Sequence, residues 1–154
     1  MNFSDAKTYL LRRLKEELPK NLHYHGLHHT YDVYNSAQEI ADYEGIEGDD
    51  RIILYTATLF HDAGFIWQYH DNEPLAAGMV RDVLPDFGYS TEQIETIAKI
   101  ILSTKISTEP TTDLERIMCD ADHDYFGRSD YHVIADSLFR ELREYGEAMG
   151  EIEW

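Results

Sequence analysis

The chain has 154 residues, with 30 acidic and 13 basic side chains and a formal net charge of −17 at pH 7. This length favours a single domain, residues 1–154, that buries its own core, and the presence of one cysteine, Cys119, excludes an intramolecular disulfide. The negative charge disfavours long nucleic acid and anionic membranes as partners, and the lack of an N-terminal apolar segment or of a run of ~18 apolar residues predicts a cytoplasmic protein.

Apolar residues recur at helical spacing along the chain, and the alternating pattern typical of strands is absent. Ser4 is the expected N-cap of the first helix, which ends at Pro19. The second helix is expected to begin near His28 and to end at Gly45, because glycine favours the position just after a helix.

The next three helices are marked by acidic, proline and capping residues. The acidic pair at residues 49–50 suits the positive end of a helix dipole and begins the third helix, which stops at Gly64. Pro74 opens the fourth helix and Pro85 ends it. Residues 90–93, Ser-Thr-Glu-Gln, predict a capping box for the fifth.

Two further helices complete the pattern. Thr112 or Asp113 caps the sixth, which contains Ala121, and Asp130 is the expected cap of the seventh, which continues through Leu142. Because all seven segments follow the helical period, the predicted fold class is all-α, a single-domain bundle of about seven helices.

Half of the eight histidines lie close together, directly before and at the start of the second predicted helix. They are His23, His25, His28 and His29. One interpretation is an exposed polar loop. The other is a metal site, because neutral imidazole is a common ligand of divalent transition metals. The cluster by itself favours neither.

The pair His61-Asp62 follows an apolar helix and precedes Gly64. Polar groups in such a place are costly unless they are paired or bind a ligand. At a helix end, where glycine lets the backbone turn, both side chains can reach one ion. The pair alone favours a simpler alternative, a histidine near the negative end of the helix dipole followed by a loop aspartate.

Three carboxylates lie at residues 120–124, at the end of the sixth predicted helix. Asp122 follows Ala121, which belongs to the buried face, and is therefore the carboxylate expected nearest the core. For Asp120 and Asp124 a solvated acidic turn is the simpler interpretation.

Taken together, the order of His29, His61-Asp62 and Asp122 resembles the HD-domain superfamily of metal-dependent phosphohydrolases. The resemblance covers about residues 24–130. It implies an HD-type helical domain in which these four side chains bind a divalent metal.

Two narrower resemblances add detail. Tyr24-His25 is similar to a segment of the cyclic-nucleotide phosphodiesterases, which belong to the same superfamily, and this implies that His25 is a general acid. Residues 61–65, 101–105 and 119–127 are similar to a smaller group of predicted bacterial HD hydrolases.

The chain departs from the common HD pattern in two places. Phe65 follows Gly64, where many HD enzymes have lysine. Two-metal HD enzymes add two histidines between the central pair and the last aspartate, but this chain has Asn72-Glu73 and Ser-Thr-Lys at residues 103–105. The resemblance therefore favours one tightly bound metal and leaves room for a second, weak site through Glu73 or His70.

A shell of two imidazoles and two carboxylates suits Mn, Fe, Zn, Ni or Co better than Mg. Asp62 is then expected to bind the ion and accept a proton from water, while His25 protonates the leaving oxygen. The expected substrate contacts are Lys105, Arg128, Glu73 and Tyr24. For Lys105 and Arg128, a solvated surface position is an equal alternative.

The predicted function is metal-dependent hydrolysis of a small phosphate ester, with a nucleotide monoester or cyclic diester as the expected substrate. The alternative is a metal-stabilised nucleotide-binding or regulatory HD module without catalysis, which the loss of lysine after Gly64 favours. Residues 146–154 mix acidic and apolar side chains and are expected either to pack on the partner of a homodimer or to cap the domain.

Overall fold

The computed structural model describes residues 1–147, and within that range the chain is helical throughout, with no strand. The predicted all-α class is confirmed. The segment expected to pack on a partner or cap the domain lies mostly outside the described residues. The α-helices are α1 (Phe3–Glu17), α2 (Leu27–Glu44), α3 (Gly48–Phe60), α4 (Asn72–Val83), α5 (Thr91–Ser103), α6 (Asp113–Asp122) and α7 (Tyr131–Glu144). Three 3-10 helices, η1 (Ala63–Ile66), η2 (Leu84–Phe87) and η3 (Asp124–Gly127), follow α3, α4 and α6.

Most predicted helix ends are confirmed. The predicted capping box forms between Ser90 and Gln93 before α5, and Thr112, one of the two expected caps of the sixth helix, forms a second box with Glu115 before α6. Gly45 ends α2 in the left-handed conformation, with φ 70°.

Three predicted ends are wrong. Helix α4 begins at Asn72, two residues before Pro74. The first helix is capped by Asn2, not Ser4, because the Asn2 side chain accepts a hydrogen bond from the backbone N–H of Asp5 and its own backbone N–H donates to Phe87. The third helix ends at Phe60, not Gly64, because the chain turns at Asp62 and continues as η1.

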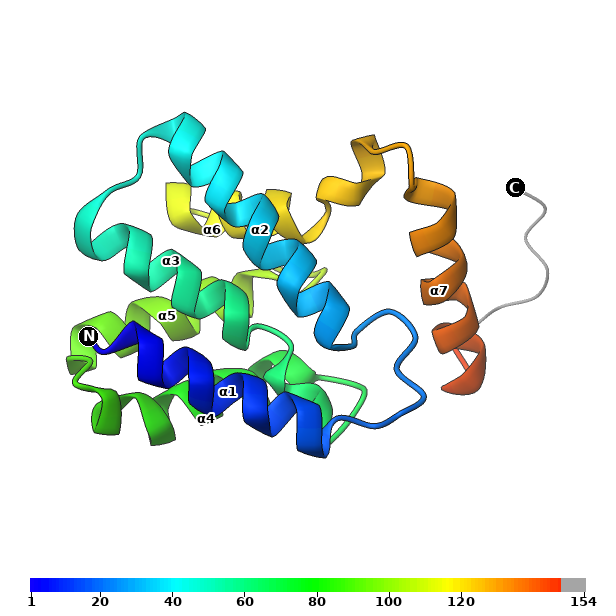
Figure 1. Cartoon of the computed structure of the whole chain (residues 1–154), viewed down its shortest axis with the longest axis horizontal. Coiled ribbons are helices and arrows are strands. Elements are labelled where there is room, and N and C mark those ends of the chain that lie inside the picture. The colour runs from blue at the N-terminus through cyan, green and yellow to red at the C-terminus, as the bar shows by residue number, and fades with distance from the viewer. Residues whose placement is uncertain (148–154) are drawn as a thin grey trace.

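Helices α1 to α6 form the body of the molecule around one apolar core (Figure 1). Leu10 on α1, Phe60 on α3, Ile97 on α5 and Met118 on α6 are all fully buried in it. Among the described residues, no helix has the length and apolarity needed to cross a membrane.

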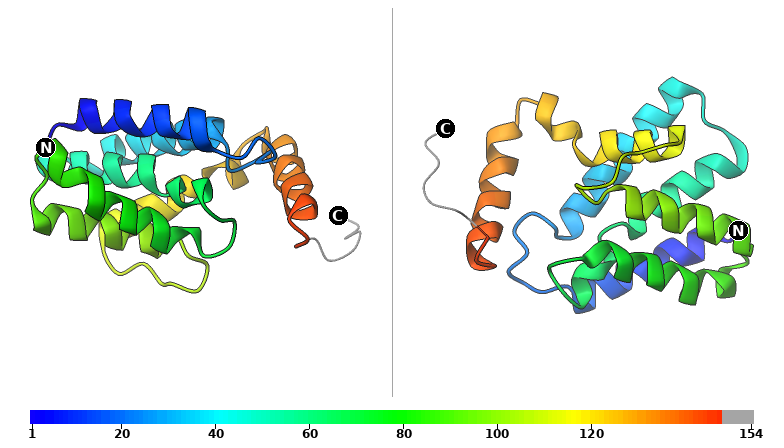
Figure 2. Two further views of the ribbon diagram at one scale, coloured as in Figure 1. Left: turned by 90° about the horizontal axis from the view of Figure 1, so that it is seen from below. Right: turned by 180° about the vertical axis from the view of Figure 1, so that it is seen from behind.

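Helix α7 lies at one side of this body, apart from α1 and α4 in both views of Figure 2. It packs mainly against the neighbouring η3. The loop between α1 and α2, which carries His23 and His25, lies on the side of the body that faces α7 (Figure 1). Among the residues of α7, only Glu141 is buried.

Candidate metal centre

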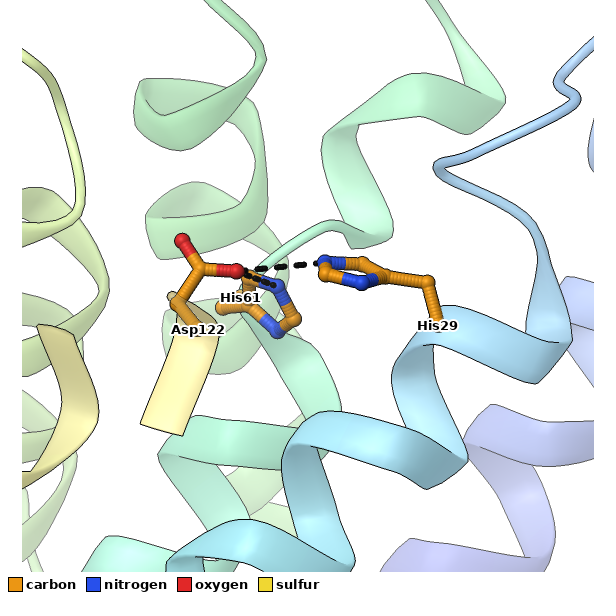
Figure 3. A group of neighbouring side chains, drawn as sticks. All are labelled: His29, His61 and Asp122. Carbon is orange, nitrogen blue, oxygen red and sulfur yellow. Dashed lines mark ion pairs between the residues drawn. The ribbon is translucent and has the colours of Figure 1, made fainter. Parts of the chain in front are cut away.

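Three helix ends place the predicted metal ligands next to one another. His29 lies in the first turn of α2, His61 follows the last residue of α3, and Asp122 is the last residue of α6. Figure 3 shows the three side chains pointing toward one another from these elements. Each offers one ligand atom, and the three atoms lie within 4.8 Å of one another.

Asp62 adds a second carboxylate to this group. The Asp122 Oδ1 atom lies 3.1 Å from His29 Nε2 and 3.5 Å from His61 Nε2. Asp62 Oδ2 lies 3.4 Å and 3.2 Å from the same two nitrogens. The structure therefore brings together the four residues predicted to bind the ion, although their role as ligands stays a prediction. We refer to these four residues as the metal cluster.

Several polar atoms of the metal cluster are buried without a hydrogen-bond partner among the described residues. They are His29 Nε2, His61 Nε2 and Asp62 Oδ2. A buried polar atom without a partner costs about 1–3 kcal/mol, so a native protein rarely keeps three of them together. A divalent cation would bind all three atoms at once, and the set of two nitrogens and two carboxylates fits such an ion.

The ring of His61 is oriented for metal binding by its other nitrogen. His61 Nδ1 donates a hydrogen bond to the carbonyl oxygen of Thr58, at 2.7 Å. Because a carbonyl oxygen can only accept, Nδ1 carries the proton. The lone pair of the neutral ring is then on Nε2, the atom that faces the carboxylates, as in most metal-binding histidines.

The charges of the metal cluster perturb its own ionisation. Burial alone would lower the pKa of His61, but the neighbouring Asp62 and Asp122 carboxylates raise it well above its ordinary value. Burial alone would raise the pKa of Asp122, but its contacts with His29 and His61 hold it well below its usual range. The raised pKa of His61 means that a proton competes with a cation for this site.

Gly64 allows the turn after the metal cluster to pack closely on α4. A Cβ atom at this position would overlap the backbone carbonyl of Asn72, at the start of α4. The glycine that sequence analysis interpreted as a helix end therefore has a different role, which is to let η1 and α4 touch.

His25, the predicted general acid, lies beside the metal cluster. Its ring centroid is 5.7 Å from that of His29, and its ring stacks on Phe65 with the centroids 4.3 Å apart. Burial lowers the pKa of His25, but its hydrogen bond to Glu141 and the nearby carboxylates outweigh this and raise it. Phe65, which stands where many HD enzymes have lysine, thus packs on the candidate acid.

The predicted substrate contacts differ in how they lie relative to the metal cluster. Tyr24 is buried and its ring lies 4.4 Å, between centroids, from that of His29. Lys105 has a 40% exposed side chain and forms an ion pair with Asp71. Among the described residues, no hydrogen bond or ion pair joins Lys105 or Glu73 to the metal cluster, so their roles stay predictions.

Arg128 lines the same cavity as His29, but its guanidinium already donates to two carboxylates. Its Nη1 atom donates to both carboxylate oxygens of Asp32 at 2.9 Å, and Nε and Nη2 donate to Asp130. A substrate phosphate would have to compete with these carboxylates. Arg128 nevertheless borders a cavity of about 290 Å³ beside the metal cluster. This cavity is lined by Tyr24, His28, His29, Asp32, Arg128, Val133, Ile134 and Ser137.

The predicted weak second metal site has no comparable cluster. His70 has a 64% exposed side chain and faces Glu147, at 3.3 Å. In the described part of the chain, only His29, His61 and Asp122 form a group of three or more candidate ligand atoms this close together. The weak second site through Glu73 or His70 therefore stays a prediction.

Sequence analysis missed Glu141, whose carboxylate contacts His25. A clue was present: Ile134, Leu138 and Glu141 follow one another at helical spacing, so a carboxylate stands on the apolar stripe of α7. Charged residues are rarely buried unless they have a partner, and this position could have been singled out for that reason.

Comparison with known proteins agrees with this geometry. A Clostridium beijerinckii protein described as uncharacterized is 31% identical over 105 residues, a match that spans 66% of this chain and 66% of the relative. No solved structure matches the chain. A family model for the HD domain matches residues 26–125, well over half of the chain. The chain therefore belongs to the HD-domain superfamily of metal-dependent phosphohydrolases, whose members bind divalent metals and are generally hydrolases.

Proposed function

We propose that this protein is a metal-dependent phosphohydrolase that cleaves a phosphate ester of a small molecule in the cytoplasm, with nucleotides as the expected substrate class. One observation carries the proposal. Three buried polar atoms of the metal cluster lack hydrogen-bond partners within residues 1–147, and a candidate proton donor, His25, lies directly beside them. An inert core would not keep such a group together.

The residues divide the chemistry between them. His29, His61, Asp62 and Asp122 would hold a Mn, Fe, Zn, Ni or Co ion, which would polarise the phosphoryl group and lower the pKa of water. Asp62 accepts the proton that the attacking water loses. His25 gives a proton to the oxygen that leaves phosphorus, so a poor leaving group departs as an alcohol rather than an alkoxide.

The cavity beside His29 supports a small substrate. Its volume of about 290 Å³ is near the lower end of ordinary ligand pockets, which suits a molecule the size of a nucleotide or smaller. The net charge of −17 repels long polyanions, whereas a bound cation would attract a single phosphate locally.

The test is metal analysis of the purified protein, followed by a screen of nucleotide mono- and cyclic diesters and p-nitrophenyl phosphate with Mn²⁺ supplied. We expect about one metal ion per chain and hydrolysis that stops after chelation. If no ester is cleaved with any of Mn, Fe, Zn, Co or Mg, the proposal is wrong.

A second function is favoured by a specific observation. Phe65 replaces the lysine found in many HD enzymes, and Arg128 is already bound by two carboxylates, so the site has few free cations for a phosphate. A nucleotide-binding or regulatory module, stabilised by its metal and without catalysis, would tolerate this. Nucleotide binding measured by calorimetry, with no turnover under any metal, would identify it.

A further inference from the structure

Glu141 is a carboxylate in an environment that normally excludes charge. It lies near the end of α7 and its exposed fraction is 0%. It also lies beyond residues 26–125, which match the HD domain, so the family match assigns it no role. A buried carboxylate is stable only when hydrogen-bond donors replace the water it has lost.

Four donors surround the Glu141 carboxylate. Its Oε2 atom accepts from the backbone N–H groups of Tyr24, at 2.7 Å, and of His25, at 3.0 Å. Its Oε1 atom accepts from the Tyr69 hydroxyl at 3.1 Å and from Nδ1 of the His25 ring. Three separate segments, α7, the loop before α2 and the loop before α4, therefore meet at this one side chain.

The bond to the His25 ring decides which nitrogen is available. An ionised carboxylate can only accept, so Nδ1 of His25 carries a proton and Nε2 is the nitrogen left for chemistry. Phe65 stacks on the ring with an angle of 28° between the planes, which fixes the tilt that the hydrogen bond leaves free. The His25 side chain keeps 20% of its surface exposed, so a ligand can reach it.

A second pair on the same helix shows what a simple surface contact looks like. Glu144 lies three residues after Glu141 and pairs with Nε2 of His23 at 2.7 Å. Its side chain is 45% exposed, and His23 makes no contact with the metal cluster among the described residues. The two pairs combine the same residue types but differ in burial and in distance from the candidate site.

We propose that Glu141 is a positioning residue for the reaction, an inference that rests on the proposed function because His25 acts as an acid only there. Glu141 holds the His25 ring with Nδ1 protonated, so that Nε2 delivers the proton to the leaving oxygen as its bond to phosphorus breaks. Asp62 takes a proton from the attacking water, and the return of that proton to His25 restores both groups for the next cycle. Helix α7 is thus part of the active site.

The test compares E141Q with E144Q, the same substitution at the exposed position. Glutamine keeps the size of the side chain and an oxygen for the backbone N–H groups, but removes the negative charge. With Mn²⁺ present, we expect E141Q to lose about 10–100-fold activity on an alkyl phosphate. On p-nitrophenyl phosphate, whose leaving group needs little protonation, the loss should be much smaller. E144Q should match the wild type on both.

A double variant separates positioning from folding. If Glu141 acts through His25, the H25A/E141Q protein should be no less active than H25A alone, because the two residues work as one unit. A merely structural role would reduce activity equally on both esters and add to the effect of H25A, and either result would overturn the proposal. If E141Q does not fold, E141D keeps the charge and should show a smaller loss, again confined to the alkyl phosphate.

A spectroscopic measurement tests the positioning of His25 by Glu141 without an activity assay. In ¹H–¹⁵N spectra of the histidine rings of the Zn²⁺-loaded protein, we expect a hydrogen-bonded Nδ1 proton on His25 that E141Q removes or shifts and E144Q leaves unchanged. An unchanged His25 signal in E141Q would overturn the proposed positioning. If no ester is cleaved but the signal responds, the proposed function fails while the placement of His25 by Glu141 stands.

Discussion

The chain contains two buried polar clusters, which touch through His25 and His29. They differ in whether their polar atoms have hydrogen-bond partners. In the metal cluster, two imidazole nitrogens and a carboxylate oxygen are buried with no hydrogen-bond partner among the described residues. Around Glu141, both carboxylate oxygens accept hydrogen bonds from neighbouring donors. One cluster is incomplete in the protein alone and the other is complete.

This difference separates binding from positioning. Unsatisfied buried groups cost free energy that a bound cation, or at lower pH a proton, can offset, so the stability of the metal cluster should depend on what is in the buffer. A satisfied carboxylate needs nothing further, and its effect is to hold its neighbours in one arrangement. The predictions below test this contrast, from the largest expected effect to the smallest.

Asp62→Asn should be almost inactive. The change weakens a metal ligand and also removes the proton acceptor, so the loss should exceed the ~10²–10⁴-fold typical of a single acid or base. Steady-state rates with saturating Mn²⁺ measure it. Asp136→Asn, at an exposed position on α7, is the control and should be fully active. Comparable rates for Asp62→Asn and wild type would remove Asp62 from the mechanism.

His25→Ala should keep the metal and lose activity by ~10²–10⁴-fold on an ester with a poor leaving group. The loss should shrink on p-nitrophenyl phosphate, because its leaving group departs without a proton. Metal content is measured on the same sample. An equal loss on both esters would show that His25 is not the acid.

His61→Ala should remove the stabilisation that metal gives to the wild type. With free metal at 100 times Kd, that stabilisation is about 2.7 kcal/mol. The melting temperature is measured with metal and after chelation. The wild type and the exposed-histidine control His132→Ala should both melt at a higher temperature with metal, and His61→Ala should not. A metal-dependent rise in His61→Ala would argue against His61 as a ligand.

Gly64→Ala should destabilise the fold by about 1–3 kcal/mol, the usual range for overpacking, because the added methyl group meets the Asn72 backbone. Gly78→Ala is the matched control. This glycine lies within α4 and a Cβ there meets nothing within 4 Å, so alanine should stabilise the helix by about 0.5–1 kcal/mol. Urea unfolding measures both, and destabilisation of equal size in the two variants would refute the packing argument.

Metal affinity should fall as the pH falls. Because Asp62 and Asp122 raise the pKa of His61 well above its ordinary value, lowering the pH adds a proton to the metal-free site that the ion must displace. Below that raised pKa, Kd should increase by up to about tenfold per pH unit for each proton displaced, and above it Kd should level off. Titrations between pH 6 and 9 in weakly coordinating buffers measure the slope. A metal affinity that does not change with pH would contradict this competition between a proton and the metal ion.

The sequence by itself determined the helical class, most helix ends and the four residues of the metal cluster. These features depend on local rules, such as periodicity and capping boxes, and on a motif whose residues sit at helix ends. The wrong predictions at Ser4 and Gly64 were also made from local sequence patterns. Their cause was tertiary, because η2 binds Asn2 and α4 packs against Gly64.

Only the tertiary structure decided what each of the clustered histidines contacts. His29 lies beside His61 and Asp122, whereas His25 meets Glu141, which is 116 residues away in the sequence. No local pattern can report a contact over that distance, because it depends on where α7 comes to lie after the body has folded. The types of ligand were therefore present in the sequence, but the placement of the candidate acid comes from packing alone.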